Sequence, residues 1–182
     1  MSRYGEKKNL EVTILSGDRD TFQLATDKVT IRIPHTKGGK TETDLYNKEK
    51  IIEKYGIEPQ QLIDVKGLQG DTSDNIPWIP WFWPKKAIDL INSYWSVEWI
   101  YENLDKITGK TKETLTQKRD LAELSKKLAT IDRQVNLWNF SLESNNFLTK
   151  NILNDEIKEY FRAHEFFSLI WEENVNLKKW ED

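Results

Sequence analysis

The spacing of hydrophobic and polar positions changes near residue 47. Before it, the short β-branched runs Glu11–Leu15 and Lys28–Pro34 are bounded by polar loops, as strands are. A brief helix through Phe22 and Leu24 is predicted between them. After residue 47 the apolar residues recur every three or four positions, which predicts helices. The expected fold class is therefore α/β followed by all-α.

Several local signals fix where the predicted elements begin and end. A glycine pair marks a turn in the polar stretch 36–47, Gly56 follows a helical segment as a cap does, and Pro59 suits a first helical turn. The predicted helices are Asn47–Tyr55, Pro59–Leu68, Pro84–Tyr94, Ser96–Ile107, Lys112–Ile131 and Asp155 to about Ile170. Apolar residues at helical spacing in the fifth helix are expected in the core: Leu121, Leu124, Leu128 and Ile131.

The composition narrows the class of protein. A chain of 182 residues can bury the core of one domain or of two small ones. It has no cysteine, which excludes disulfides and thiolate metal sites and favours a reducing compartment such as the cytoplasm. No apolar run approaches the ~18 residues of a membrane span, so no membrane partner is expected. The formal net charge is −3, so any nucleic-acid-binding surface must be local.

Two pairs of aspartates have the spacing of candidate metal ligands. Asp18 and Asp20 follow the first strand, and in extended geometry their side chains would point the same way. Asp71 and Asp74 would share one side of a helical turn. Phosphodiester cleavage commonly uses two divalent ions about 3.5–4 Å apart in a carboxylate cluster. Each pair alone is more often a set of turn formers or helix N-caps than a metal site, so neither pair identifies a metal site by itself.

Four segments, read together, resemble one enzyme family. They are SGDRDTFQL, KYGIEPQQLIDVKGLQGDTSDNIP, PKKAIDLI and LSKKLATIDR, which lie in this order between about Glu11 and Arg133. They resemble the flap-endonuclease family, in the form of the 5′–3′ exonuclease domain of bacterial DNA polymerase I. The block GDTSDNIP, followed by a helix-hairpin-helix, makes the resemblance highly specific.

The resemblance implies a division of the chain. Residues 1–70 would form the C-terminal half of a PIN-like α/β nuclease core, and residues 71–131 the metal-binding loop and the helix-hairpin-helix. Residues 132–182 would form a C-terminal helical region. The helix-hairpin-helix, at about Ile76–Ile91, would grip the backbone of double-stranded and flapped DNA, with a K⁺ ion at the hairpin.

The resemblance also implies Mg²⁺-dependent hydrolysis of DNA phosphodiester bonds by a 5′–3′ exonuclease or flap endonuclease of replication and repair. The catalytic and metal-binding residues would be Asp18, Asp20, Asp71 and Asp74, which would hold two Mg²⁺ or Mn²⁺ ions. The family's N-terminal half, with further acidic ligands, has no counterpart in this sequence, so the isolated chain is expected to be inactive. The alternative is a non-catalytic, structure-selective DNA-binding module. A polymerase domain in the full-length gene product is a further implied partner.

The stretch IPWIPWFWPKKA departs from the family pattern, which reads approximately IPGxPGxGPKxA. Trp78, Trp81 and Trp83 stand at hairpin glycine positions, next to Lys85 and Lys86, and these five are the expected DNA-binding residues. Glycine suits such a hairpin because it adopts positive φ freely and lets backbone N–H groups approach a phosphate. A tryptophan disfavours positive φ, and its indole blocks the approach of a phosphate to the backbone. The two lysines would contact phosphates without reading bases.

Trp95 and Trp99 also stand where the family often has glycine. Tryptophan and glycine each number eight here, although glycine normally makes up about 7% of residues. We hypothesise that UGA codons meaning glycine in the source organism are read as tryptophan at all five positions. In the alternative, literal interpretation, Trp81 and Trp83 are stacking platforms for single-stranded bases or membrane-interface anchors.

Overall fold

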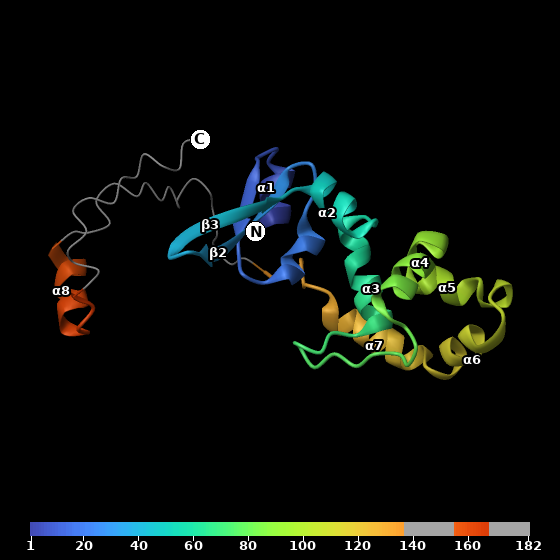
Figure 1. Ribbon diagram of the computed structural model, residues 1–182. Coiled ribbons are helices and arrows are strands. Elements are labelled where there is room, and N and C mark those ends of the chain that lie inside the picture. The colour runs from blue at the N-terminus through green and yellow to red at the C-terminus, as the bar shows by residue number, and fades with distance from the viewer. Residues whose placement is uncertain (137–154, 168–182) are drawn as a thin grey trace. The chain divides into compact units, whose positions relative to one another are not determined.

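The computed structural model describes residues 1–136 and 155–167. The chain divides into two compact units, Met1–Asn136 and Leu137–Asp182. The first unit holds a small sheet followed by packed helices (Figure 1), which confirms the expected order of α/β and then all-α. Its sheet and its helical part have separate clusters of buried side chains, and Tyr55 and Leu62 pack against both.

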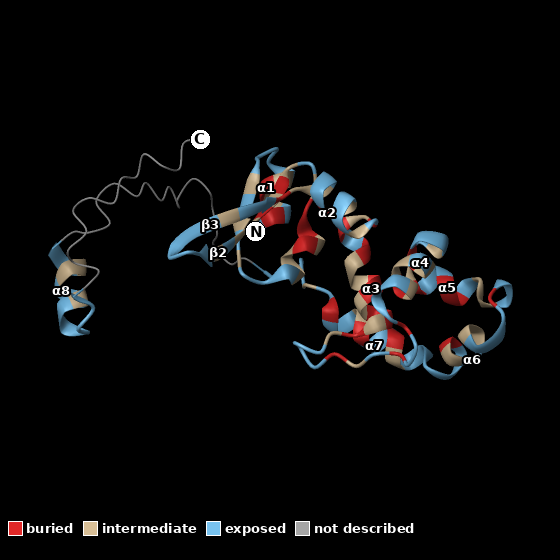
Figure 2. Cartoon of the chain, viewed as in Figure 1, coloured by how far each residue is buried: buried red, intermediate tan, exposed pale blue. Residues whose placement is uncertain are grey.

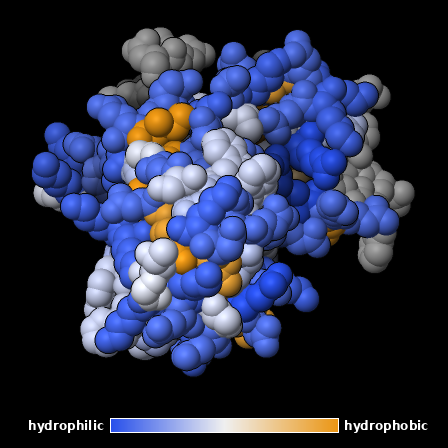
Figure 3. Space-filling view, turned by 90° about the vertical axis from the view of Figure 1, so that its right-hand side faces the viewer, coloured by the Kyte–Doolittle hydropathy of each residue, from blue (hydrophilic) through white to orange (hydrophobic). Residues whose placement is uncertain are grey.

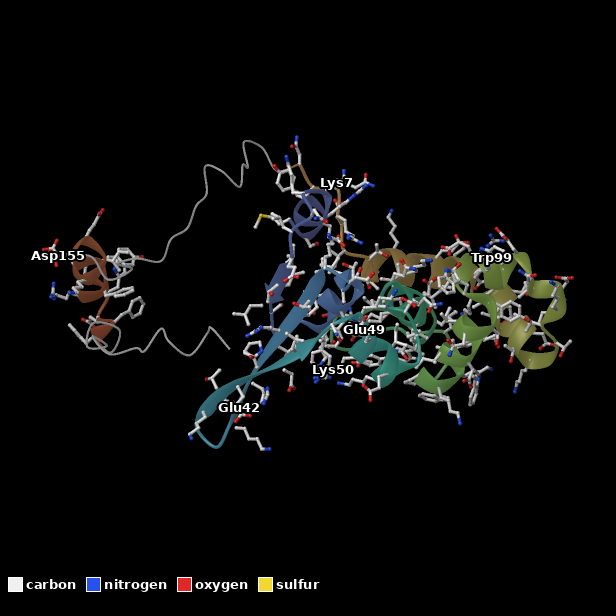
Figure 4. The ribbon with its side chains drawn as sticks, turned by 90° about the horizontal axis from the view of Figure 1, so that it is seen from above. Lys7, Glu42, Glu49, Lys50, Trp99 and Asp155 are labelled. Atoms are coloured by element: carbon white, nitrogen blue, oxygen red, sulfur yellow. The ribbon has the colours of Figure 1, made fainter. Side chains whose placement is uncertain are left out.

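The sheet has three strands in the order β1–β2–β3. They are β1 Val12–Leu15, β2 Val29–Lys37 and β3 Lys40–Tyr46. β1 pairs parallel with β2, and β2 pairs antiparallel with β3. Both predicted strands are confirmed, whereas the expected polar turn is the tip of a β2–β3 hairpin, whose outer part carries Glu42 (Figure 4). The sequence pattern does not predict β3, because only Tyr46 of that strand is buried.

The first unit contains seven α-helices and three short 3-10 segments. The α-helices are α1 Ser2–Lys7, α2 Lys48–Tyr55, α3 Leu62–Gln69, α4 Pro84–Tyr94, α5 Val97–Glu102, α6 Gly109–Gln117 and α7 Arg119–Ala129, and the 3-10 segments are η1 Arg19–Leu24, η2 Pro59–Gln61 and η3 Leu104–Lys106. The predicted helix 112–131 is two helices, because the backbone at Lys118 (φ −117°, ψ 23°) is not helical. The predicted helix 96–107 likewise ends at Glu102 and is followed by η3.

Buried residues of α3, α4, α5 and α7 form one hydrophobic cluster, and Figure 2 marks the buried positions along these helices. This helical cluster includes Leu68, Ile79, Ile91, Ile100 and Leu115. The sheet cluster contains Phe22, Ala25, Val29, Ile31, Tyr46 and Ile51. Each fully buried large apolar side chain contributes about 1.5–3 kcal/mol to folding, so both halves of the unit have a core of their own.

The buried face of α7 differs from the predicted one. Its buried residues are Ala122, Ser125 and Ala129. Leu124 and Leu128 are 48% and 57% exposed, so the prediction that they pack in the core was wrong. Small side chains are buried instead because α7 lies very close to α3. A Cβ placed on Gly67 of α3 would lie 3.3 Å from the Ala122 carbonyl oxygen.

A buried ion pair joins three of these helices. Asp64 of α3, whose side chain is only 6% exposed, accepts a hydrogen bond of 2.6 Å from the Lys126 Nζ of α7. It also accepts one of 2.8 Å from the backbone N–H of Val97, at the start of α5. Lys126 reaches Glu98 of α5 as well, at 2.7 Å. Burial raises the pKa of Asp64 even against the attraction of Lys126.

The described part of the second unit is α8, Asp155–Ala163, and the residues that follow it up to 167. Tyr160 stacks on His164 there, with ring centroids 4.1 Å apart. The helix ends at Ala163, so its expected continuation was wrong for residues 164–167, where Glu165 has φ 59°. Residues 168–170 and most of the expected helical region 132–182 lie outside the described residues. Within residues 1–136 and 155–167, no helix combines the length and the apolar character that a membrane crossing requires.

Candidate metal centre and nucleic-acid interface

Three of the four predicted carboxylates come together in the first unit. Asp20 lies in η1, just after β1, while Asp71 and Asp74 lie in the loop between α3 and α4. One carboxylate oxygen of each lies within 4.8 Å of the other two. In the part of the chain that the structure describes, no other group of three or more acidic or histidine side chains brings its ligand atoms this close together.

Asp18 is placed differently from these three. The extended geometry of β1 ends at Asp18 (φ −86°, ψ 118°), because η1 begins at the next residue. The Asp18 carboxylate accepts a hydrogen bond of 2.8 Å from the backbone N–H of Asp20, as a helix N-cap does. Its side chain therefore lies outside the 4.8 Å group, although it lines the same cavity.

The loop that carries Asp71 is held by a tight backbone arrangement. Gly70 has φ +70°, and a Cβ there would lie 2.7 Å from the carbonyl oxygen of Ile76. Asp71 and Ile76 form an isolated antiparallel bridge, with N–H···O bonds of 3.0 and 2.8 Å. The Asp71 side chain in turn accepts a bond of 2.9 Å from the Ser73 N–H. Only glycine suits position 70, since it tolerates both the positive φ and the close approach.

Lys66 of α3 is a residue of this centre that the sequence analysis missed. Its Nζ bonds to the carboxylate of Asp20, lies 2.6 Å from that of Asp71 and is 4.0 Å from that of Asp74. The lysine side chain is 19% exposed. The available signal was a lysine in an otherwise mainly apolar helix, one turn before the aspartate loop.

The lysine and the carboxylates change one another's acidity. Burial acts to raise the pKa of Asp71, but hydrogen bonds from Lys66 and Ser73 outweigh it and lower this pKa to about 2. Burial acts to lower the pKa of Lys66, but bonds to Asp20 and Asp71 raise it above its ordinary value. Desolvation and repulsion from Asp71 and Asp20 raise the pKa of Asp74. Asp71 and Lys66 are therefore an ion pair at neutral pH.

A cavity of about 510 Å³ lies beside the acidic group. All four aspartates and Lys66 line it, together with apolar side chains from η1, α2 and α3. A donor set made entirely of carboxylate oxygens fits a hard divalent cation, which also retains waters and needs such space. Asp20, Asp71 and Asp74 could hold one such ion, and Asp18 lines the same cavity.

The loop between the acidic group and α4 carries the predicted DNA-binding tryptophans. Trp78, Trp81 and Trp83 are 56%, 63% and 69% exposed, respectively. Ile79 and Phe82 between them are buried in the helical cluster. The loop is therefore anchored by its two apolar residues, and its indoles project into solvent. The face shown in Figure 3, which is turned 90° from Figure 1, is mainly hydrophilic, with small and separate apolar areas.

Lys85 and Lys86 lie in the first turn of α4. Neither forms an ion pair with a described residue, and Lys86 Nζ lies 4.6 Å from the centroid of the Phe82 ring. A helix N-terminus is already positive, so two lysines there disfavour the helix and create a local anion-attracting surface. The helix-loop-helix formed by α3, residues 70–83 and α4 is wider than the expected Ile76–Ile91.

Two of the five tryptophans at expected glycine positions have a left-handed backbone. Trp81 has φ +70°, and Trp95, the C-cap of α4, has φ 69° and ψ −46°. Both conformations are ones that glycine adopts freely. Trp99 lies within α5 instead, and its side chain is 56% exposed at the surface of the unit (Figure 4). The tryptophans at positions 81, 95 and 99 are all more than half exposed, so the packing of the unit does not require a side chain there.

Known proteins resemble this chain in sequence. The family model described as "5′-3′ exonuclease, C-terminal SAM fold" matches residues 57–152. DNA polymerase I of Bacillus subtilis is 47% identical over 132 residues, which cover 72% of this chain and 15% of that protein. DNA polymerase I of Caldicellulosiruptor bescii is 43% identical over 161 residues, covering 88% of this chain and 19% of that protein. The chain thus spans only a small part of these curated relatives.

Solved structures of low sequence identity share the fold. A T5 5′-exonuclease with bound zinc ions matches with a TM-score of 0.56 at 21% identity, over 70% of this chain and 47% of that one. A bacteriophage T5 flap endonuclease in a complex with DNA and metal ions matches with a TM-score of 0.53 at 21% identity, over 70% and 48%. Since the family model covers more than half of the residues, the chain belongs to the 5′–3′ exonuclease family and carries its C-terminal SAM fold.

Proposed function

We propose that this chain is part of a 5′–3′ exonuclease or flap endonuclease, which hydrolyses phosphodiester bonds of DNA during replication and repair. The observation that carries the proposal is the gathering of Asp20, Asp71 and Asp74 around one point, directly before a helix that begins with Lys85 and Lys86. The membership of the family and the DNA polymerase I relatives support it.

The carboxylates would hold Mg²⁺ or Mn²⁺. The T5 structures, one with zinc and one with unspecified metal ions, support a metal ion in this family but not its identity. Such ions activate a water as nucleophile and neutralise charge on the leaving oxygen. In this proposal the direct ligands are Asp20, Asp71 and Asp74. Asp18 lines the cavity beside them and adds its negative charge to the site. Ser73 keeps the Asp71 carboxylate oriented through its backbone and hydroxyl groups.

We further propose that the isolated chain is inactive, because three gathered carboxylates are few for two ions. The test incubates the chain with an end-labelled flapped duplex and Mg²⁺ or Mn²⁺, while Mn²⁺ binding is measured separately. We expect Mn²⁺ binding that Asp71→Asn weakens, and no turnover. Robust cleavage would contradict the inactivity, and a chain that binds no Mn²⁺ would contradict the metal centre.

The surface around α4 is proposed to grip the backbone of double-stranded and flapped DNA, with K⁺ at the loop before the helix. Phosphate contacts by Lys85 and Lys86 predict binding that weakens steeply with salt and ignores base sequence. The charge-removing pair Lys85→Gln and Lys86→Gln should weaken binding and reduce its salt slope by about 2. Lys118→Gln with Lys127→Gln, which removes two charges at exposed positions away from α4, is the matched control. Equal loss in the control would count against this interface.

A second candidate function is a non-catalytic, structure-selective DNA-binding module. It is favoured by the ammonium of Lys66 within the acidic group, which leaves the described carboxylates partly neutralised. Metal titration separates the two, because a nuclease fragment should bind Mn²⁺ or Mg²⁺ through the aspartates Asp18, Asp20, Asp71 and Asp74, whereas a pure binding module need not. As part of the main proposal, the full-length product carries a polymerase domain and is located in the cytoplasm. The DNA polymerase I relatives support this.

We also propose that the protein in its own organism has glycine at positions 78, 81, 83, 95 and 99. The left-handed backbone at Trp81 and Trp95 supports this, as does the exposure of all five indoles. Glycine would leave the loop N–H groups open to a phosphate, whereas an indole crowds it. Peptide masses of the native protein test the proposal directly. UGG codons at positions 78, 81 and 83 would contradict it.

A further inference from the structure

We propose that Lys66 is a built-in counter-cation of the metal centre. Its ammonium occupies the cation position among Asp20, Asp71 and Asp74 in the metal-free protein, and a divalent ion binds by displacing it. Lys66 thereby sets how tightly the chain holds its first ion. This inference rests on the metal centre assigned under the proposed function.

The Lys66 ammonium and a divalent metal ion would compete for the same position among the three carboxylates. The three carboxylate oxygens lie within 4.8 Å of one another, and the Lys66 ammonium touches two of the three groups. A metal ion would need the same oxygens at about 2.0–2.6 Å. An ammonium and a divalent ion on these same carboxylates repel each other at such distances, so binding of the ion disfavours the ammonium there.

The lysine is fixed at its base and has room at its tip. Its carbonyl accepts the N–H of Gly70 at 2.8 Å, which ties Lys66 to the loop that carries Asp71. Its four-carbon stem is flexible, and the side chain lines the 510 Å³ cavity. The ammonium can therefore leave the carboxylates without movement of α3.

Removal of the lysine separates its two effects. Without the ammonium the carboxylates repel one another, so the metal-free chain is less stable. The same change removes the competitor for the oxygens, so a divalent ion binds more tightly. A lysine that only helped to hold a metal or only packed in the cavity would give the opposite change in affinity, or none.

The experiment measures Mn²⁺ affinity by the loss of the free-ion electron spin resonance signal. It compares the full chain with Lys66→Met and with Lys127→Met, which removes an equal charge from an exposed site of α7 that makes no ion pair with a described residue. We expect Lys66→Met to bind Mn²⁺ about tenfold more tightly, in the usual range of coupling between two ligands of one site. The control should stay within about twofold.

The outcomes distinguish this inference from the function on which it rests. Equal or weaker binding by Lys66→Met, with clear binding by the unaltered chain, overturns the counter-cation and leaves the metal centre in place. If neither chain binds Mn²⁺, both proposals fail.

A second measurement uses the unaltered chain and so does not depend on the folding of a variant. The ammonium ¹⁵N resonances of the lysines are followed during a Mg²⁺ titration, with Lys66→Arg used for assignment. We expect the Lys66 signal to be protected from solvent exchange without Mg²⁺ and to lose that protection when the ion binds. Lys126, held by Asp64 and Glu98, serves as internal reference. A Lys66 signal that Mg²⁺ leaves unchanged overturns the inference.

Discussion

At the scale of single residues, the backbone at Trp81 and Trp95 conflicts with the side chains it carries. Both have positive φ, where a Cβ costs about 1–2 kcal/mol. The conformation at Trp95 is nevertheless fixed, because its N–H bonds to Ile91 and its carbonyl oxygen accepts from Gln61. The surrounding fold thus imposes a glycine-type conformation on a tryptophan.

Replacement by glycine should therefore stabilise the chain at these two positions. We expect Trp81→Gly and Trp95→Gly each to raise the free energy of unfolding in urea by about 1 kcal/mol. The matched control is Trp99→Gly, which is equally exposed but lies in α5 with helical geometry. It should lower stability by about 0.5–1 kcal/mol. A change in stability of the same sign at all three positions would contradict the view that positive φ causes the strain.

Asp71 gives a pH dependence with a definite sign. Its pKa is about 2 in the folded chain and 3.8 ordinarily, so its contribution to stability is complete above pH 3.8 and is lost as the pH falls from 3.8 towards 2. Asp71→Asn should therefore be less stable than the unaltered chain at pH 5, with a difference that shrinks on acidification. Urea unfolding of both chains between pH 5 and pH 2.5 measures this. A difference independent of pH would show that the carboxylate charge is irrelevant.

The four aspartates were predictable only through the family resemblance, because their spacing alone is also typical of turn formers and helix N-caps. Their arrangement was not predictable, since the prediction extended β1 geometry through Asp20, whereas the 3-10 segment η1 begins at Arg19. Lys66 escaped prediction for another reason. A single lysine in a helix usually lies in solvent, and only the folded chain brings it to carboxylates that are distant in sequence.

At the scale of elements, the loop after α3 depends on one glycine. Gly70 and Gly56 both have φ +70°, but only at Gly70 would a Cβ meet the backbone, at Ile76 and Pro77. The two glycines thus separate the effect of φ from the effect of close approach.

Alanine substitutions should show this difference. We expect Gly56→Ala to lower the free energy of unfolding by about 1–2 kcal/mol. Gly70→Ala should add a further loss of about 1–3 kcal/mol from overpacking, and should also weaken Mn²⁺ binding by displacing Asp71. Urea unfolding and Mn²⁺ titration of the two variants provide the comparison. Equal losses would show that the loop yields to the added methyl group.

The elements with a clear hydrophobic period were predictable, and those without one were not. β3 and α1 carry too few buried residues to leave a pattern, as only Tyr46 in β3 and Ser2 and Gly5 in α1 are buried. In α7 the period was visible but its face was misassigned. The most apolar positions of α7 are its leucines, whereas the close approach of α3 selects for small side chains.

At the scale of the whole molecule, the first unit is one body with two cores. The cores meet at Tyr55 and Leu62. Gln23 adds a second link: its side chain donates to the carbonyl of Ala129 and accepts from the N–H of Ile131, beyond the end of α7. The acidic group lies where these halves join, since Asp20 belongs to one and Asp71 to the other.

A chain that ends at residue 136 should therefore fold without the remainder. We expect it to unfold in one cooperative urea transition and to bind Mn²⁺ as the full chain does. A chain that ends at residue 117 lacks α7, with its buried Ala122, Ser125 and Ala129, and should not fold. Circular dichroism during urea titration measures both. A chain 1–136 without a cooperative transition would contradict the independence of the first unit.

The sheet order gives β1 a neighbour on one side only among the described residues. On its other side no described strand pairs with the backbone N–H and C=O groups of β1, and Leu15 nearby is 63% exposed. Such an exposed edge can pair with a strand of another polypeptide by β-strand addition. At high concentration the chain should thus join edge to edge into dimers or larger aggregates, and a short peptide of strand-forming sequence added in excess should cap the growth.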